Sequence, residues 1–172
     1  MKISVFAGVS LDGFLARKNH ELDFLPEGGN EDYGEFIATV DAIVIGRNTF
    51  EKVLSFGGWA YGKKPVFVLS SRPIDLSVVD GGVVEQLGGE PAAIAGELER
   101  RGFSHLYVDG GVTVQRFLRA GLVSRIIITH VPVLIGDGIP LFGPLPHDIA
   151  LQHVGTKTLP GGLVTSEYTI PR

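Results

Sequence analysis

Residues 42–50 read Ala-Ile-Val-Ile-Gly-Arg-Asn-Thr-Phe, and this stretch decides the fold. A short apolar run bounded by polar residues is typical of a buried parallel strand, because β-branched side chains fit a pleat that is covered on both faces. Gly46 lets the backbone turn tightly, and Asn48 or Thr49 is suited to cap the helix that follows. The free amides of that helix, with Arg47 beside them, predict an anion site above the sheet. The alternative is that this turn only connects the strand to the helix and binds no anion.

Length and composition set the class of protein. The chain has 172 residues, enough for one domain spanning residues 1–172, and no cysteine, which excludes disulfides and cysteine-based metal sites. The five histidines lack the spacing of metal ligands, so we expect no metal. The net charge is −4 and the basic residues are scattered, so we expect no nucleic-acid partner. No basic leader or membrane-length apolar run is present, which predicts a cytoplasmic protein without membrane contact.

Strand and helix patterns alternate along most of the chain and predict an α/β fold. We expect a mostly parallel central sheet with helices on both faces and one C-terminal antiparallel hairpin. The predicted strands are 3–9, 42–46, 65–69, 83–85, 106–108 and 125–134, the predicted helices are 30–40, 48–56, 90–101 and 113–120, and the hairpin strands are 150–156 and 163–170. The first helix is expected to begin at Asn30, and residues 10–16 are expected to turn.

Three of the predicted strands end in groups that suit phosphate. These ends are residues 46–49 (Gly-Arg-Asn-Thr), 70–72 (Ser-Ser-Arg) and 110–113 (Gly-Gly-Val-Thr). The carboxyl ends of parallel strands meet at one edge of a sheet, so three such turns indicate an extended anion such as a dinucleotide. The chain lacks the full G-x-G-x-x-G and P-loop patterns, which argues against both standard nucleotide sites.

The order of these turns resembles a known family. The chain resembles the dihydrofolate reductase superfamily in four motifs. These are Ser-Leu-Asp-Gly at residues 10–13, followed by strand-Gly-Arg-x-Thr, strand-Ser-Ser-Arg and strand-x-Gly-Gly-helix. Residues 10–16 and 40–47 are similar to its branch called the RibD C-terminal domain, the reductase half of the bifunctional deaminase-reductase of riboflavin synthesis and its stand-alone bacterial relatives. The resemblance covers nearly the whole chain and implies the three-layer fold of dihydrofolate reductase.

The resemblance implies NADPH as the cofactor. Segments matching the family's phosphate, adenine and nicotinamide contacts supply the following candidate cofactor residues: Ala7, Leu15, Gly46, Arg47, Thr49, Ser70, Ser71, Arg72, Gly110, Gly111, Val112 and Thr113. Two arginines and no acidic residue in the matching loops favour the 2'-phosphate of NADPH over NADH.

Four residues are candidates for the substrate. Asp32 and Thr129 fall where the folate-reducing branch keeps a carboxylate that grips the substrate ring and its hydroxyl helper. Asp12 either faces the substrate or starts a turn, and Asp32 either grips the substrate or complements its helix dipole. Trp59 either stacks on a heterocycle or covers a subunit contact. Asp32, Asp12 and Thr129 are the catalytic candidates, and Asp12, Asp32 and Trp59 are the substrate-binding ones.

The predicted function is NADPH-dependent reduction. The resemblance implies an oxidoreductase acting on CH-OH or CH-NH type groups, with hydride transfer to a small heterocyclic or ribosylamino-pyrimidine molecule, similar to 5-amino-6-(5-phosphoribosylamino)uracil reductase. Lys64 stands where a folate reductase has an arginine for the glutamate tail, and the zinc cysteines of the deaminase are absent. Dihydrofolate reductase and a non-catalytic NADP-binding module remain the alternatives.

A homodimer is the expected assembly. The mean hydropathy of +0.25 is high for a chain of this size. The long strand at residues 126–134 would leave an open edge near the end of the chain, which would invite association.

Overall fold

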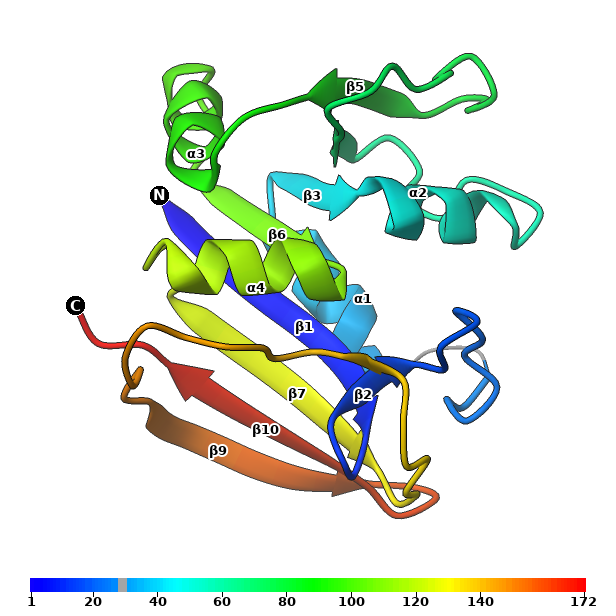
Figure 1. The fold of residues 1–172 in the computed structure, drawn as a ribbon, viewed down its shortest axis with the longest axis vertical. Helices are drawn as coiled ribbons and strands as arrows, with labels where there is room; N and C mark the ends of the chain where they lie inside the picture. Colours follow the sequence, from blue (N-terminus) through cyan, green and yellow to red (C-terminus); the bar gives the residue numbers. More distant parts are fainter. Residues whose placement is uncertain (28–30) are drawn as a thin grey trace.

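The computed structural model describes residues 1–27 and 31–172 as an eight-stranded sheet with four helices and one small two-stranded sheet (Figure 1). Asn30, the expected start of the first helix, lies outside the described residues. The elements are β1 (Lys2–Ser10), β2 (Phe14–Ala16), α1 (Glu31–Thr39), β3 (Ala42–Gly46), α2 (Arg47–Leu54), β4 (Pro65–Leu69), β5 (Val83–Leu87), α3 (Pro91–Arg100), β6 (His105–Asp109), α4 (Gly111–Arg119), β7 (Arg125–Val131), β8 (Ile139–Pro140), β9 (Gln152–Leu159) and β10 (Leu163–Thr169).

The large sheet is mostly parallel and covered on both faces, which confirms the predicted fold class. Its strand order is β5-β4-β3-β6-β1-β7-β10-β9, and only the β7–β10 and β10–β9 pairs are antiparallel. Side chains alternate across each strand, so β1 sends Val5 to one core cluster and Phe6 to the other. The first cluster contains residues of α3 and α4, and the second contains residues of α1 and α2. In Figure 1 α4 accordingly lies in front of the sheet and α1 behind it.

The C-terminal hairpin forms as expected, but it changes the place of the strand before it. β9 and β10 pair antiparallel from Leu159–Leu163 to Gln152–Thr169. β7 then lies between β1 and β10, so the expectation that this long strand forms an open edge is wrong. β7 also ends at Val131, three residues before its expected end. The edges of the sheet are β5 and β9.

Two helices begin directly at the ends of their strands. α2 starts at Arg47 with Gly46 as its N-cap, so Asn48 and Thr49 lie inside the first turn and neither caps the helix. α4 likewise starts at Gly111, after Gly110 with φ of 95°, and not at Thr113. Because both helix starts are tight against the sheet, their free amides lie close to the strand ends.

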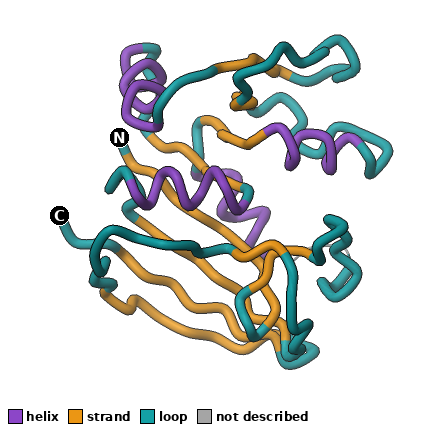
Figure 2. Tube along the Cα trace, viewed as in Figure 1, coloured by secondary structure: helices purple, strands orange, loops and turns teal. Residues whose placement is uncertain are grey.

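The remaining segments are loops and turns that join the helices and strands (Figure 2). Part of the turn expected at residues 10–16 forms β2, which pairs antiparallel with β8. The strand expected at residues 83–85 extends to Leu87 as β5. Among the residues described, no helix has the length and apolar character needed to cross a membrane.

Candidate functional site

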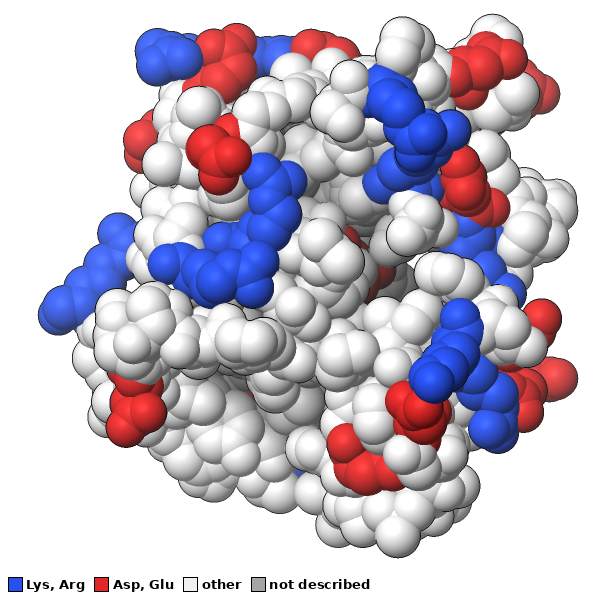
Figure 3. All heavy atoms as spheres, in the orientation of Figure 1, with Lys and Arg blue, Asp and Glu red and all other residues white. Residues whose placement is uncertain are grey.

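A cavity of about 1120 Å³ opens at the carboxyl ends of the parallel strands. Its walls come from the ends of β1, β3, β4, β6 and β7, together with the helix starts that follow β3 and β6. All twelve of the candidate cofactor residues, from Ala7 to Thr113, line it. Figure 3 shows this front surface hollowed between two groups of basic side chains, with acidic atoms deep in the hollow. The three phosphate-type turns therefore meet in one place, as expected for parallel strands.

The starts of α2 and α4 face the same part of the cavity. β3 and β6 are neighbours in the sheet, and neither helix has a side-chain cap on its first amides. The two turns interlock: a Cβ added to Gly46 would lie 2.9 Å from Thr113 Oγ1, and one added to Gly110 would lie 2.5 Å from Thr49 Oγ1. Paired helix N-termini with uncapped amides form a ready site for an anion such as a pyrophosphate.

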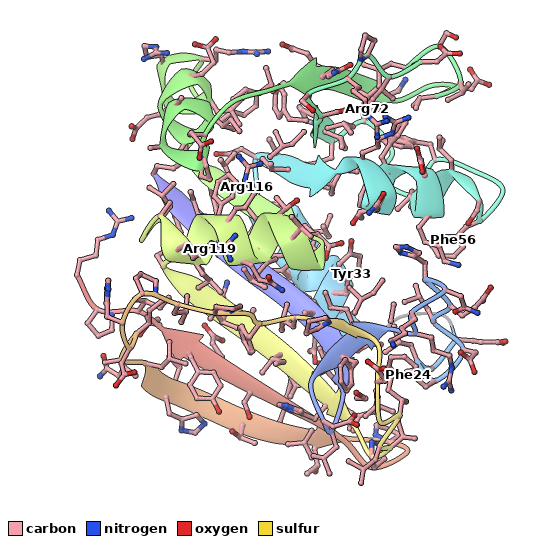
Figure 4. The ribbon with its side chains drawn as sticks, viewed as in Figure 1. Phe24, Tyr33, Phe56, Arg72, Arg116 and Arg119 are labelled. Carbon is pink, nitrogen blue, oxygen red and sulfur yellow. The ribbon has the colours of Figure 1, made fainter. Side chains whose placement is uncertain are left out.

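Three arginines line the same end of the cavity. Arg47 Nε donates to Glu51 Oε1 at 2.9 Å, whereas Arg72 forms no ion pair with any residue the structure describes. Ser70 shapes the turn that carries Arg72, because its hydroxyl accepts the Arg72 N–H at 3.2 Å and donates to the Arg72 carbonyl at 2.7 Å. Arg116 of α4 is the third, and Figure 4 shows it on the α4 side, with Arg72 on the side of β4 and β5.

The four substrate candidates separate into different places. Thr129 of β7 lines the cavity, with its Oγ1 2.7 Å from Thr165 Oγ1. Asp12 does not line it: its carboxylate accepts the backbone N–H groups of Ile135 at 3.3 Å and Gly136 at 2.8 Å. Hydrogen bonds, chiefly from Ser10, lower the pKa of Asp12. Asp12 therefore joins two turns and has a structural role instead of a substrate-facing one.

Asp32 and Trp59 also lie outside the lining of the main cavity. Asp32 Oδ1 accepts a charge-assisted hydrogen bond from Lys157 of β9 at 2.5 Å, and it borders a separate hollow of about 490 Å³ between α1 and the strands β7, β9 and β10. Trp59 packs edge-to-face against Phe50 and Tyr61, with ring centroids 6.0 and 5.3 Å away. Asp32 is thus turned toward the hairpin, and Trp59 belongs to the packing behind the cavity wall.

Asp109 lines the cavity beside a group of tyrosines. From the sequence it was expected only to start a turn. It is the last residue of β6, and Tyr107 shares its face of the strand. Tyr33 and Tyr61 also line the cavity, and Tyr33 meets Tyr107 edge-to-face at 6.2 Å. A carboxyl group directly before a diglycine helix start, at the carboxyl end of a strand, is the sequence signal that could have identified it.

The hydrogen bonds around Asp109 stabilise its charged form. The Tyr107 hydroxyl donates to the Phe6 carbonyl at 3.1 Å and shares hydrogen bonds with the side chains of Asp109 and Tyr33. The hydrogen bonds from the Gly110 N–H and from Tyr107 both lower the pKa of Asp109. Asp109 Oδ1 remains the acceptor for the Gly110 N–H at 2.8 Å.

Burial acts on Asp109 in the opposite direction and outweighs these hydrogen bonds. Withdrawal from water raises the pKa of Asp109 above the ordinary 3.8, because the charged form loses solvation. Burial also raises the pKa of Tyr33 to about 12, and it raises the pKa values of Tyr61 and Tyr107 as well. The tyrosines are therefore neutral near pH 7, and Asp109 is the group in this cluster that exchanges a proton most readily.

The outer wall of the cavity is apolar. Loop residues Leu22, Leu25 and Pro26 line it, and Phe56 faces it from beyond α2. Two exposed ion pairs lie beside the loop that carries the first three: Arg17 with Asp23 at 2.6 Å, and Lys18 with Asp137 at 2.6 Å. No group of three metal-type ligands occurs within residues 1–27 and 31–172. The cavity thus combines a cationic end with an apolar, tyrosine-lined end.

Comparison with known proteins identifies the family. The family model of the RibD C-terminal domain matches residues 1–165. A solved structure of a putative riboflavin biosynthesis protein from Shewanella sp. PV-4 is 36% identical, covers 100% of both chains and superposes with a TM-score of 0.90. The uncharacterized protein YwjB of Bacillus subtilis is 34% identical over 91% of each chain.

A more distant neighbour establishes the fold type. The dihydrofolate reductase of Enterococcus faecalis, solved in complex with NADP(H) and RAB-propyl, covers 99% of this chain and 97% of its own, with 14% identity and a TM-score of 0.68. The three-layer dihydrofolate reductase-like fold is therefore confirmed. With the match of the family model over residues 1–165 and the two relatives above 30% identity, the chain belongs to the RibD C-terminal domain family.

Proposed function

We propose that this protein is an NADPH-dependent reductase that transfers hydride to a small heterocyclic or ribosylamino-pyrimidine molecule. One observation carries the proposal: a single cavity joins two uncapped helix N-termini and three arginines to a tyrosine-lined region with one carboxyl group. The first part suits a dinucleotide with an extra phosphate, and the second suits a flat ring that accepts a hydride. Membership of the RibD C-terminal domain family and the riboflavin-synthesis name of the Shewanella relative support the substrate class.

The residues present fit NADPH. The amides that open α2 and α4 lie where the pyrophosphate would be held. Glycine at 110 and 111 lets this turn pack closely, because an added Cβ would lie 2.5 Å from Thr49 Oγ1 and 2.8 Å from the Pro140 carbonyl oxygen, respectively. Ser71 and Arg72 would take the adenosine end, and the backbone at Ala7 and the side chain of Leu15 would border the nicotinamide. NADPH, when bound, supplies the hydride.

Asp109 is the proposed source of the proton. Hydride addition to the carbon of a C=N or C=O group leaves a pair of electrons on the nitrogen or oxygen, and that atom takes up one proton to complete the reduction. Burial raises the pKa of Asp109 and so favours its acid form, and the hydrogen bond with Tyr107 would keep the carboxyl group oriented in the cavity. The apolar loop over this end would keep water from the reacting carbon.

Folate is disfavoured as the substrate by the position of Lys64. Its ammonium group donates to the Val40 carbonyl at 2.6 Å, and Lys64 does not line the cavity. A folate tail would therefore lose the cation that its carboxylates need. The direct test is NADPH oxidation with a panel of dihydrofolate, pteridines and ribosylaminopyrimidines. Oxidation with pyrimidines supports the proposal, oxidation only with dihydrofolate supports the alternative, and NADPH binding without any turnover indicates a binding module.

NADPH should bind much more tightly than NADH. Each charge-assisted bond to the 2'-phosphate contributes roughly 1.5 to 3 kcal/mol, so two arginines favour NADPH by about two orders of magnitude. Arg72→Ala should remove about tenfold or more of that preference, while Arg119→Ala, an exposed arginine outside the cavity, should leave it unchanged. Titration of both cofactors measures this. Equal affinities in the wild-type protein would contradict the assignment.

A homodimer remains our proposal for the assembly, now through the β9 edge. The outer side of β9 has no strand partner in the described sheet, and Val154 on it is 57% exposed. Light scattering at micromolar concentration should give twice the monomer mass. Val154→Lys should weaken the dimer about tenfold, because burial of a valine contributes about 1.5 kcal/mol or more. A monomeric wild-type protein would refute the dimer, and an unaffected variant would refute this edge.

A further inference from the structure

Arg116 lines the cavity but lies outside the three turns that the sequence predicts to bind phosphate. It belongs to α4, one helical turn after Val112, so the two residues share the helix face that lines the cavity. Its Nη2 donates to the Gly89 carbonyl at 2.9 Å. The segment Gly88–Glu90, between β5 and α3, lines the same end of the cavity as Arg72. The cationic end is therefore bounded by guanidinium groups from two directions (Figure 4).

Arg116 has an acidic neighbour. Glu90 Oε2 lies 3.9 Å from Arg116 Nη2, and the Glu90 side chain is 87% exposed. An ion pair that is so long and so exposed contributes little, because water and salt screen it. A phosphate group with close to two negative charges would form shorter, charge-assisted bonds and would displace Glu90 readily.

Arg47 is less available than Arg72 or Arg116 to bind a phosphate group at this end of the cavity. Its Nε is bound to Glu51 at 2.9 Å within α2, and it stands at the helix start, beside the amides suited to the pyrophosphate. Arg72 has no ion pair among the described residues, and the long contact to Glu90 is the ion pair of Arg116, whose Nη2 also donates to the Gly89 carbonyl. Arg72 and Arg116, which lack a strong ion pair, thus lie at the end of the cavity where the adenosine would be held.

We infer that Arg116 and Arg72 together hold the 2'-phosphate of the cofactor, and that Glu90 competes with the phosphate for Arg116 and so tunes the choice between NADPH and NADH. The inference rests on the proposed function and deepens it. A carboxylate near the adenosine ribose favours NADH, because it accepts hydrogen bonds from the ribose hydroxyls and repels a phosphate. Glu90 would then oppose the two arginines, and the balance of the three residues would set the preference.

The test is titration of NADPH, NADH, adenosine 2',5'-bisphosphate and adenosine 5'-monophosphate against single variants. Arg116→Ala should weaken NADPH and the bisphosphate about tenfold or more, with NADH and the monophosphate changed less than about threefold. Arg116→Lys should restore part of the loss, because it keeps the charge but loses the planar fork. Glu90→Gln should tighten NADPH about threefold and leave NADH unchanged or weaker. Arg119→Ala, on the next turn of α4, is the matched control and should change nothing.

The outcomes separate the inference from the proposed function. If the wild-type protein binds neither cofactor, both are overturned. If it prefers NADPH and Arg116→Ala keeps the full preference, or weakens NADPH and NADH equally, the assignment of Arg116 is overturned and the reductase proposal stands. Thermal unfolding of Arg116→Ala shows whether loss of the hydrogen bond to the Gly89 carbonyl destabilises the fold. If it does, the cofactor affinities of Arg116→Lys decide whether Arg116 binds the 2'-phosphate.

Discussion

Replacing Asp109 with Asn lowers turnover of an identified substrate by about 100-fold or more in our expectation, because a positioned general acid contributes at least that factor. NADPH affinity should change by less than about threefold, since Asn keeps the oxygen that accepts the Gly110 N–H and so preserves the turn. Steady-state rates and cofactor titrations measure the two effects. Asp80→Asn, an exposed carboxylate outside the cavity, is the matched control and should behave as wild type.

The pH dependence gives an independent readout for Asp109. Burial raises its pKa above 3.8, so the acid form persists to higher pH, and kcat/KM should fall as pH rises through the raised pKa. Stability follows the same sign: the contribution is full below pH 3.8, where folded and unfolded chains are both protonated, and is lost as pH rises through the folded pKa. The Asn variant should show neither trend. If the Asn variant keeps wild-type turnover and its kcat/KM still falls as pH rises, Asp109 is not the acid.

Replacing Gly110 with Ala should damage both stability and cofactor binding. Gly110 has φ of 95° and ψ of 135°, a region that side chains rarely occupy, and the strain alone amounts to about 1 to 3 kcal/mol. The added Cβ would also lie 2.5 Å from Thr49 Oγ1, so the starts of α2 and α4 must move apart. Because both helix starts bound the anion site, NADPH affinity should fall about tenfold or more.

Two further variants separate strain from crowding at Gly110. Thr49→Ala in the Gly110→Ala background removes the close contact but leaves the strained backbone, so it should recover only part of the lost stability. Gly96→Ala is the control: Gly96 lies within α3, its Cβ would meet only Arg100 Nη1 at 3.9 Å, and the change should stabilise the protein by roughly 0.5 to 1 kcal/mol. Urea unfolding measures all three. A Gly110→Ala protein as stable as wild type would contradict the proposed interlock of the two turns.

Local patterns were sufficient wherever structure depends on neighbours in the chain. The run at 42–46 and its glycine predicted β3 and the helix start after it, and the alternation at 163–170 predicted β10. The three phosphate-type turns could be placed at one cavity because parallel strands carry their carboxyl ends to the same edge. Even there the helix caps were wrong, since the residue at which a strand becomes a helix depends on how tightly the helix packs on the sheet.

The directions of side chains, by contrast, were decided by the tertiary structure. Asp32 is in a helix first turn, as its sequence suggests, but the return of the hairpin brings Lys157 to it and turns it from the main cavity. The same hairpin pairs with β7 and removes the expected open edge.

The sequence by itself determined the order of strands and helices, the turns at their ends and the family resemblance, because propensity, periodicity and glycine chemistry act over a few residues. Only the tertiary structure decided which charges share a space. Burial in the tertiary fold raises the pKa of Asp109, and the Arg116 side chain meets the segment before α3 through its bond to the Gly89 carbonyl. Such groups are distant along the chain, and their pairing follows from how the sheet twists and its loops fold over it.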